Sequence, residues 1–321
     1  MIVSASCRTD IPAFYSEWFF RRLEAGHCTV RNPYSGQSYR VDLRKKQVDG
    51  FVFWTRNFGP MLRRLDELTA FGRPFVVQYT VTGYPRAIEA AVIEPQRAIE
   101  QIGEIAARVH PACPVWRYDP ILITSLTPPE YHLENFRDLA ARLQGSTDEV
   151  VVSFAQMYAK TRRNLDAAAE RNGFQWVDPA PEQKLALAAE LTQIARQFGL
   201  QLTVCTQPEF VCAGALEARC VDARRLERIG GFQIVAAQKG TRPGCACHEA
   251  RDIGDYDTCP HGCVYCYANV NKSRADTSYH AHDPNSVFLG YTRMVSDRFV
   301  AELRAKSAAK PRDPQLELPL L

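Results

Sequence analysis

Short, nearly all-apolar runs alternate with amphipathic stretches along the first two thirds of the chain. The runs are Ile2–Ser6, Gly50–Thr55, Phe75–Val81, Val115–Tyr118, Glu149–Phe154 and Leu200–Cys205, and their composition is typical of buried parallel strands. The amphipathic stretches are Ala13–Ala25, Gly59–Ala70, Pro95–Val109, Pro129–Leu143 and Pro181–Phe198, and the last three begin at proline, which suits a first helical turn. This alternation is compatible with two architectures, a doubly wound sheet or a barrel.

We predict an α/β fold, a partial or complete parallel β/α (TIM-like) barrel with a C-terminal cysteine-rich cap. The first strand is not followed by the Gly-x-Gly-x-x-Gly pattern of dinucleotide-binding folds. Polar residues gather instead just beyond several strands, where barrels carry their active sites. We expect three parts: a barrel over residues 1–229, a cysteine-rich iron–sulfur region over 230–290, and a helix with a flexible tail over 291–321.

Arginine and aspartate follow two of the predicted strands, Arg8 and Asp10 after the first and Arg117 and Asp119 after the fourth. Arginine can bind a carboxylate or phosphate through two parallel hydrogen bonds, and aspartate can accept from hydroxyl or amine groups. These four residues are candidate catalytic residues. The alternative is a structural Arg–Asp network that closes the end of the barrel.

Composition places few limits on the function. Of the 321 residues, 46% are hydrophobic, enough for a large core, and the net charge of +3 neither demands nor excludes nucleic acid. No apolar run is long enough to span a membrane, and the first residues lack the pattern of a secretory signal. We expect a cytoplasmic protein without membrane contact, in which the 11 cysteines stay reduced.

Cys259, Cys263 and Cys266 form a Cys-x3-Cys-x2-Cys run around Gly262, which allows a sharp turn. Closely spaced thiolates on one loop suit an inorganic iron–sulfur cluster. Three thiolates hold three irons of a 4Fe-4S cluster, so the fourth iron stays open to another ligand. A zinc site built from four of the nearby cysteines, or from three and a histidine, is the alternative.

This spacing, with Tyr265 before the last cysteine, resembles the signature of the radical S-adenosylmethionine (radical SAM) superfamily. The resemblance implies that the open iron binds SAM, that reductive cleavage gives a 5′-deoxyadenosyl radical, and that Tyr265 lies near the adenine. It also implies a reductant such as flavodoxin or ferredoxin.

The position of the run departs from that superfamily, whose cysteines usually follow the first strand. Here they follow the last, as in the domain-of-unknown-function 1848 family. The chain resembles that family through several segments: Ser4–Tyr15, Val52–Asn57, Trp116–Pro120, Asp252–Gly254 and Cys263–Asn269. The family names no substrate.

Four further cysteines, Cys205, Cys220, Cys245 and Cys247, suit a second 4Fe-4S cluster, since four thiolates are its usual complement. The alternative is two buried packing residues and a metal-free loop.

The segment Gln315-Leu-Glu-Leu-Pro-Leu320 resembles the peptide by which bacterial replication and repair proteins dock on the DNA sliding clamp. Its docking residues would be Gln315, Leu316, Leu318 and Leu320, and a clamp partner would place the chain at DNA.

The sequence as a whole leaves three possible functions: a radical SAM enzyme for the repair or modification of DNA or nucleotides, a zinc-stabilised non-catalytic module that binds the clamp or nucleic acid, and a radical SAM enzyme for a small metabolite.

Overall fold

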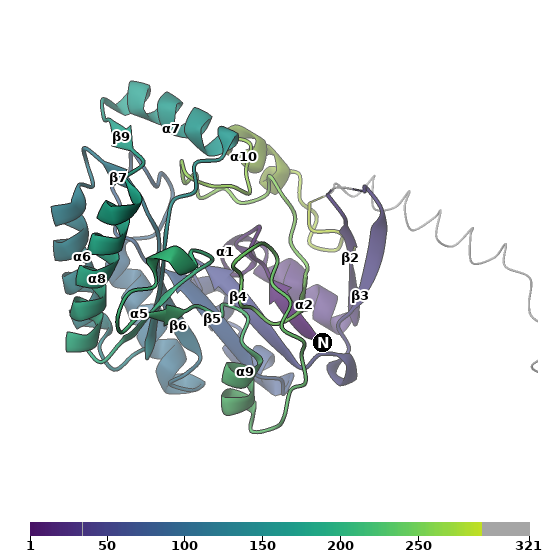
Figure 1. Ribbon diagram of the computed structural model, residues 1–321. Helices are drawn as coiled ribbons and strands as arrows, with labels where there is room; N and C mark the ends of the chain where they lie inside the picture. Colours follow the sequence, from purple (N-terminus) through teal and green to yellow (C-terminus); the bar gives the residue numbers. More distant parts are fainter. Residues whose placement is uncertain (34, 291–321) are drawn as a thin grey trace, which may run out of the picture.

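An eight-stranded, all-parallel sheet forms the centre of the computed structural model, which describes residues 1–33 and 35–290 (Figure 1). The strand order is β11-β10-β8-β6-β5-β4-β1-β12. The bounds are β1 Ile2–Ala5, β4 Gly50–Thr55, β5 Phe75–Thr80, β6 Pro114–Ile121, β8 Glu149–Phe154, β10 Gln201–Val204, β11 Leu216–Glu217 and β12 Ala250–Asp252. Because β11 and β12 are the two edges, the sheet is an open barrel, which confirms the predicted α/β fold with a partial parallel barrel.

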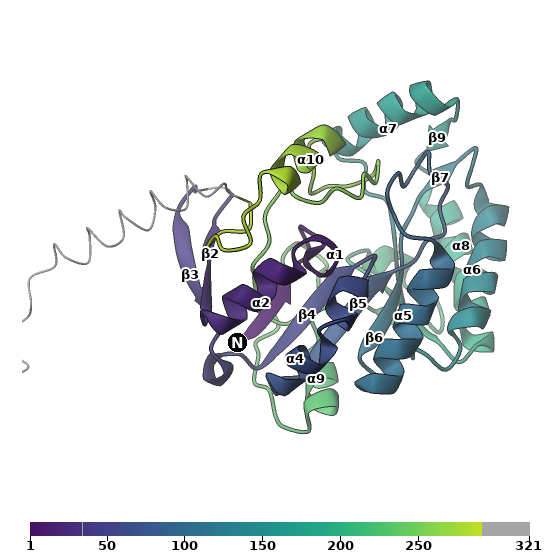
Figure 2. The same cartoon turned by 180° about the vertical axis from the view of Figure 1, so that it is seen from behind.

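Most helices cover the convex face of the sheet or lie beyond the carboxyl ends of its strands, whereas α9 packs on the concave face (Figures 1 and 2). Their bounds are α1 Ile11–Phe14, α2 Ser16–Glu24, α3 Gly59–Leu62, α4 Leu65–Ala70, α5 Pro95–Arg108, α6 Pro129–Leu143, α7 Ala159–Asn172, α8 Pro181–Gln197, α9 Ala223–Gly230 and α10 Lys272–His280. Two small sheets pair β2 (His27–Arg31) with β3 (Ser38–Asp42) and β7 (Ile123–Thr124) with β9 (Trp176–Val177). Short 3-10 turns cover Lys45–Gln47 and Pro208–Phe210.

The sheet is buried on both faces, which explains why its strands read as continuous apolar runs. Alternate residues such as Val3, Phe53 and Val77 pack toward the helices. Their neighbours Ile2, Val52, Val76, Val115 and Val151 line the concave face, where they pack against side chains from residues 218–247. The segment 218–247, which includes α9 and the coil after it, therefore lies against the concave face of the sheet (Figure 1).

Strand β12 completes the sheet although it comes last in the chain. It pairs in parallel with β1, with Asp252 opposite Ser4. The Asp252 carboxylate accepts from Ser4 Oγ (2.8 Å), Ser6 Oγ (2.7 Å), Cys7 N (2.9 Å) and Arg8 Nε (3.0 Å). Burial alone would raise the pKa of Asp252, but Arg8 and the other donors lower it below its usual value.

Several elements escaped the sequence prediction because their signals are short or polar. Strand β12 is Ala-Arg-Asp and β11 is Leu-Glu, so neither reads as a buried strand. Helix α7 offers Leu165 as its one large aliphatic side chain. The predicted helix at Ser296–Ala309 and the tail over 291–321 lie outside the described residues.

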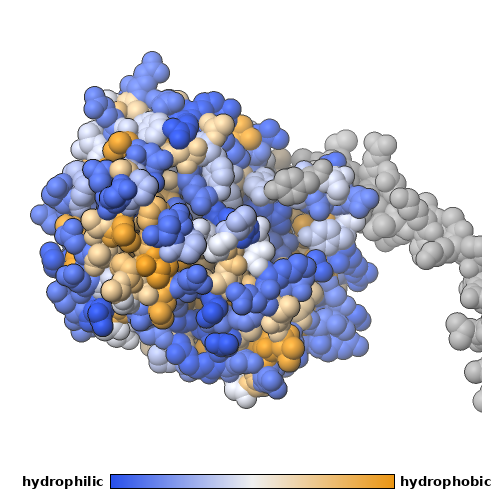
Figure 3. Space-filling view, viewed as in Figure 1, coloured by the Kyte–Doolittle hydropathy of each residue, from blue (hydrophilic) through white to orange (hydrophobic). Residues whose placement is uncertain are grey.

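Hydrophilic side chains cover much of the face seen in Figure 3, with apolar groups between them. Within the described part of the chain, no helix combines the length and apolar character needed to cross a membrane.

Replacing Asp252 by Asn should destabilise the fold by about 3 kcal/mol, because it leaves the mostly buried Arg8 without its charged partner. The loss should appear above about pH 4 and fade as the pH falls through the lowered pKa of Asp252. Urea unfolding followed by circular dichroism measures it. Asp66→Asn is the control, since Asp66 is 96% exposed in its pair with Arg108 and should change stability by less than about 1 kcal/mol. Equal effects of the two variants would contradict this account of β12.

Candidate functional site

The three clustered cysteines lie on a loop, here called the cysteine loop (residues 253–270), that leaves β12 at the carboxyl end of the sheet. Cys259, Cys263 and Cys266 are partly exposed free thiols. Gly262 has φ +71°, a left-handed conformation that favours glycine, as the sequence predicts. The Cys266 N–H donates to the Cys263 carbonyl at 3.1 Å and closes a tight turn.

A buried carboxylate–imidazole contact fastens the first half of the loop to the barrel. His261 Nε2 lies 2.7 Å from Asp10 Oδ2, and both side chains are buried. Asp10 also accepts from Thr55 Oγ1 (2.7 Å), from the backbone N–H of Arg56 (2.7 Å) and from that of Ala13 (2.9 Å). Asp10, predicted as a catalytic residue, is thus an anchor shared by β4, α1 and the cysteine loop.

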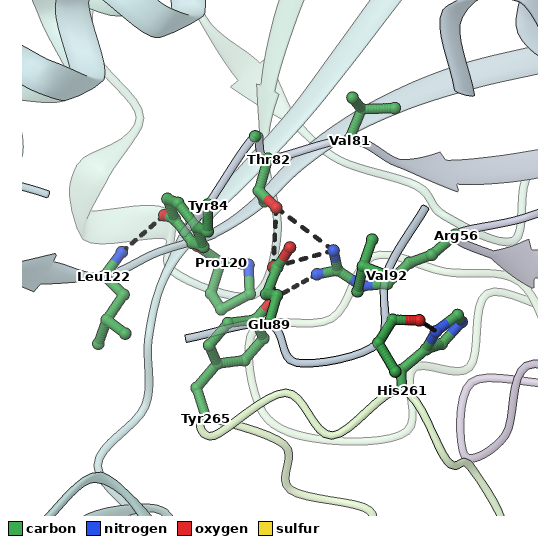
Figure 4. Close-up of polar contacts among 12 residues, drawn as sticks. Arg56, Val81, Thr82, Tyr84, Glu89, Val92, Pro120, Leu122, His261 and Tyr265 are labelled. Atoms are coloured by element: carbon green, nitrogen blue, oxygen red, sulfur yellow. Dashed lines mark hydrogen bonds and ion pairs between the residues drawn. The ribbon is translucent and has the colours of Figure 1, made fainter. Parts of the chain in front are cut away.

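A buried ion pair fastens the second half of the loop (Figure 4). Arg56 Nη1 lies 2.9 Å from Glu89 Oε1, which also accepts from Thr82 Oγ1 at 2.8 Å. The Tyr265 hydroxyl bonds to both Arg56 and Glu89. Burial raises the pKa of Tyr265, so this hydroxyl keeps its proton and donates to Glu89. A hollow of about 230 Å³ beside the pair is lined in part by Arg56, Thr82 and Glu89.

Helix α7 holds the cysteine loop from the other side. Lys160 Nζ donates to the Tyr267 carbonyl at 2.7 Å, and Arg163 Nη2 to the Val270 carbonyl at 3.3 Å. The Tyr267 hydroxyl reaches across to the Cys7 carbonyl at 2.5 Å. The loop is therefore tied to β1, to the start of α7 and to the Arg56–Glu89 pair.

The three thiols of the loop favour their protonated form in the absence of metal. Burial raises the pKa of Cys263 to about 12, although Arg56 acts in the opposite direction. Burial also raises the pKa values of Cys259 and Cys266. Metal binding at these sulfurs would therefore release protons.

The other predicted catalytic residues fall into two separate networks. Arg8 pairs with Asp252 at 2.9 Å rather than with Asp10. Arg117 Nη2 lies 2.5 Å from Asp119 Oδ2, and Ser153 donates to the same carboxylate. Both arginines are thus neutralised by a carboxylate of this chain, which is the arrangement of a structural network at the end of the barrel.

The structure brings together all four cysteines of the second predicted set. Cys205 Sγ and Cys220 Sγ are 3.6 Å apart, and Arg117 Nη1 donates to Cys220 Sγ at 2.9 Å. A hydrogen bond from Cys247 lowers the pKa of Cys245 to about 6, and Cys247 also bonds to Cys220. As placed, no three His, Cys, Asp or Glu side chains within residues 1–33 and 35–290 form a group that could hold a metal ion.

Two residues at the heart of the site were not singled out as site residues. Glu89 sits in the apolar stretch Ala87-Ile-Glu-Ala-Ala91, where a lone carboxylate that is 2% exposed demands a partner. Asp252 was visible only as part of the family-like segment Asp252–Gly254. A charged residue inside an apolar run was the available signal for Glu89.

A family profile described as domain of unknown function (DUF1848) matches residues 2–268. Comparison with the curated proteins gives no match. Among solved structures, a D-hydantoinase is similar at 11% identity and a TM-score of 0.29, over 56% of this chain and 41% of that one. An amidohydrolase from an environmental sample of the Sargasso Sea is similar at 13% identity and a TM-score of 0.33, over 91% of this chain and 68% of that one. The chain thus spans less than half the length of the hydantoinase.

Replacing Tyr265 by Phe should loosen the cysteine loop, because it removes the hydroxyl that joins the loop to Arg56 and Glu89. Amide hydrogen exchange should rise roughly tenfold or more for residues 259–268, as expected for the loss of about 1.5–3 kcal/mol from a hydrogen bond to a charged group. Tyr158→Phe is the matched control, since Tyr158 is an exposed tyrosine outside this loop. Unchanged exchange in residues 259–268 would show that the ion pair does not hold the loop.

Proposed function

This chain belongs to the DUF1848 family, and we propose that it is a radical SAM enzyme whose 4Fe-4S cluster is held by Cys259, Cys263 and Cys266. The observation that carries the proposal is the placement of these thiols. They sit together on one loop at the carboxyl end of a parallel open barrel, and the residues between them are fastened to the barrel. Active sites of β/α barrels lie at this end.

Three cysteines are the kind of donor set that a cluster with one open iron takes. The three thiols are free, their loop turns tightly at Gly262, and thiolates are the ligands that iron–sulfur clusters take. Arg56 lowers the pKa values of Cys263 and Cys266, and Lys160 also lowers that of Cys266, although burial outweighs both cations. A cluster carrying net negative charge would find both cations close to its sulfurs.

When bound, the cluster would hold SAM at its open iron and, with one electron from a flavodoxin or ferredoxin, supply a 5′-deoxyadenosyl radical and methionine. The chain's own residues position the loop for this chemistry. Asp10 holds His261, and the Arg56–Glu89 pair holds the hydroxyl of Tyr265, which leaves the Tyr265 ring in a fixed orientation. We place that ring near the adenine.

Arg8, Asp10, Arg117 and Asp119 act in this proposal as positioning residues. Each is already engaged with a partner from this chain: Arg8 with Asp252, Asp10 with His261 and Thr55, and Arg117 with Asp119. They fix the loop and the floor of the site rather than receive substrate.

DNA or a nucleotide is the substrate class that we propose, for repair or modification. The support is the sequence Gln315–Leu320, which lies outside the described residues and resembles a clamp-docking peptide. A proline-punctuated segment with alternate leucines can extend into an apolar groove. Two alternatives stay open: a small-metabolite substrate, and a zinc-stabilised module that binds the clamp without catalysis.

Anaerobic reconstitution with iron and sulfide tests the cluster. The cysteine loop should take up about four irons per chain, and the reduced protein should cleave SAM to 5′-deoxyadenosine. Cys263→Ser should abolish both, whereas Cys28→Ser, at a buried cysteine in β2, should retain them. A colourless protein that holds zinc on these three cysteines and leaves SAM intact would refute the proposal.

Pull-down with purified sliding clamp tests the partner. The full chain should bind, and a chain ending at Pro314 should not, since it lacks Gln315 and the three leucines. Leu318→Ala with Leu320→Ala should weaken binding at least about tenfold, because each buried leucine contributes about 1.5–3 kcal/mol. Equal binding by the full and shortened chains, or none by either, would defeat the clamp assignment.

A further inference from the structure

Four thiols from three separate segments meet inside the open barrel, away from the cysteine loop. Cys205 follows β10, Cys220 follows β11, and Cys245 and Cys247 lie in the coil before β12. Cys205, Cys220 and Cys247 are buried, and they pack with Val151 and Leu226 on the concave side of the sheet. Three segments of the chain thus bring their cysteine side chains together inside the barrel.

One pair of these sulfurs, Cys205 and Cys220, has the separation of two ligands on one ion. Cys205 Sγ lies 3.6 Å from Cys220 Sγ, and hydrogen bonds join Cys220 to Cys247 and Cys247 to Cys245. Two thiolates on one tetrahedral zinc, each at about 2.3 Å from the metal, are about 3.8 Å apart. In a 4Fe-4S cluster each cysteine binds a different iron, which sets the sulfurs farther apart.

Donors that would stabilise metal-bound thiolates already point at these sulfurs. Arg117 Nη1 donates to Cys220 Sγ at 2.9 Å, and the backbone N–H of Val221 donates to Cys247 Sγ at 3.4 Å. Arg117 is buried and held by Gln78, whose amide also donates to the Cys220 carbonyl at 2.9 Å. Such outer contacts orient the ligands of metal sites and offset their charge.

The coil that carries Cys245 and Cys247 folds into a tight turn. Lys239 N donates to the Cys247 carbonyl at 2.9 Å, which closes the turn. A Cβ on Gly240 would lie 2.2 Å from the Cys245 carbonyl oxygen, so only glycine permits this approach. The turn brings Cys245 and Cys247 to the same end of the coil.

We propose that Cys205, Cys220, Cys245 and Cys247 bind one tetrahedral zinc ion, at a site separate from the proposed iron–sulfur cluster. As placed, the sulfurs form a row of contacts, Cys205–Cys220–Cys247–Cys245, rather than surrounding a single point. In this proposal the end side chains, Cys205 and Cys245, turn to other staggered χ1 wells when the ion binds, so that the four sulfurs surround it. The four-thiolate ion fastens the segment 205–247 to the inside of the barrel, a structural role.

Metal analysis of a variant that lacks the cysteine-loop ligands tests the site independently of SAM chemistry. The variant Cys259→Ser, Cys263→Ser, Cys266→Ser, purified after growth with zinc, should hold about one zinc per chain and no iron. Conversely, Cys220→Ser with Cys247→Ser should lose this zinc but still take up about four irons on reconstitution. Cys113→Ser is the matched control, since Cys113 is a buried thiol that donates to the Phe75 carbonyl and lies outside the four-cysteine set.

Cobalt substitution gives a second measurement that needs no variant of the cysteine loop. Zinc-free protein titrated with Co²⁺ should show the absorption of a tetrahedral thiolate complex, and Cys220→Ser with Cys247→Ser should lose it while Cys113→Ser keeps it. A triple variant that folds without zinc, or one that holds iron and sulfide at these cysteines, overturns the proposal. The second result would establish a second cluster in its place.

Discussion

The carboxylate of Asp252 joins the last strand of the sheet to the first, and the geometry of the candidate site depends on that junction. Asp252 accepts from two serine hydroxyls, a backbone N–H and the guanidinium of Arg8, all from β1 or the turn after it. A three-residue edge strand buries little apolar surface, so polar contacts must hold it in register. The cysteine loop starts one residue later, and its thiols take their position from this pairing.

Buried charges then fix the loop at two further points. The Asp10–His261 contact lies between Cys259 and Cys263, and the Arg56–Glu89 pair reaches Tyr265 between Cys263 and Cys266. Each stretch between two cysteines is thus fastened to the barrel by one side chain, His261 in the first stretch and Tyr265 in the second. Buried pairs of this kind add little net stability but are costly to break, so they favour one arrangement over others. A site preorganised in this way can hold a cofactor without rearrangement of its frame.

The sequence predicted the strands and helices of the barrel better than the contacts between segments that are distant in the chain. Five of the six predicted strands and the helices α5, α6 and α8 match to within a residue at each end, because apolar runs and proline starts are local signals, whereas β6 extends to Ile121, beyond the predicted Tyr118. Strand β12 was missed, since Ala-Arg-Asp becomes a strand only through its pairing with β1 some 250 residues away. For the same reason Arg8 and Asp10, neighbours in sequence, were expected to act together, whereas each found a partner in the 252–261 segment. The sequence did predict that Cys205, Cys220, Cys245 and Cys247 lie together. Cysteines that could bind one metal are recognisable by residue type, without any helix or strand periodicity.

The place of β12 in the sheet sets an order of assembly. The other seven strands precede it in the chain, and the pairing of Ile2 with Ala250 is among the most distant contacts along the sequence. Contacts of such separation form late, because closing the intervening chain costs entropy. The edge of β1 that pairs with β12 therefore stays open until the last strand of the sheet has been synthesised. Because the cysteine loop follows β12 directly, its three thiols reach their final positions only after this last strand has paired with β1.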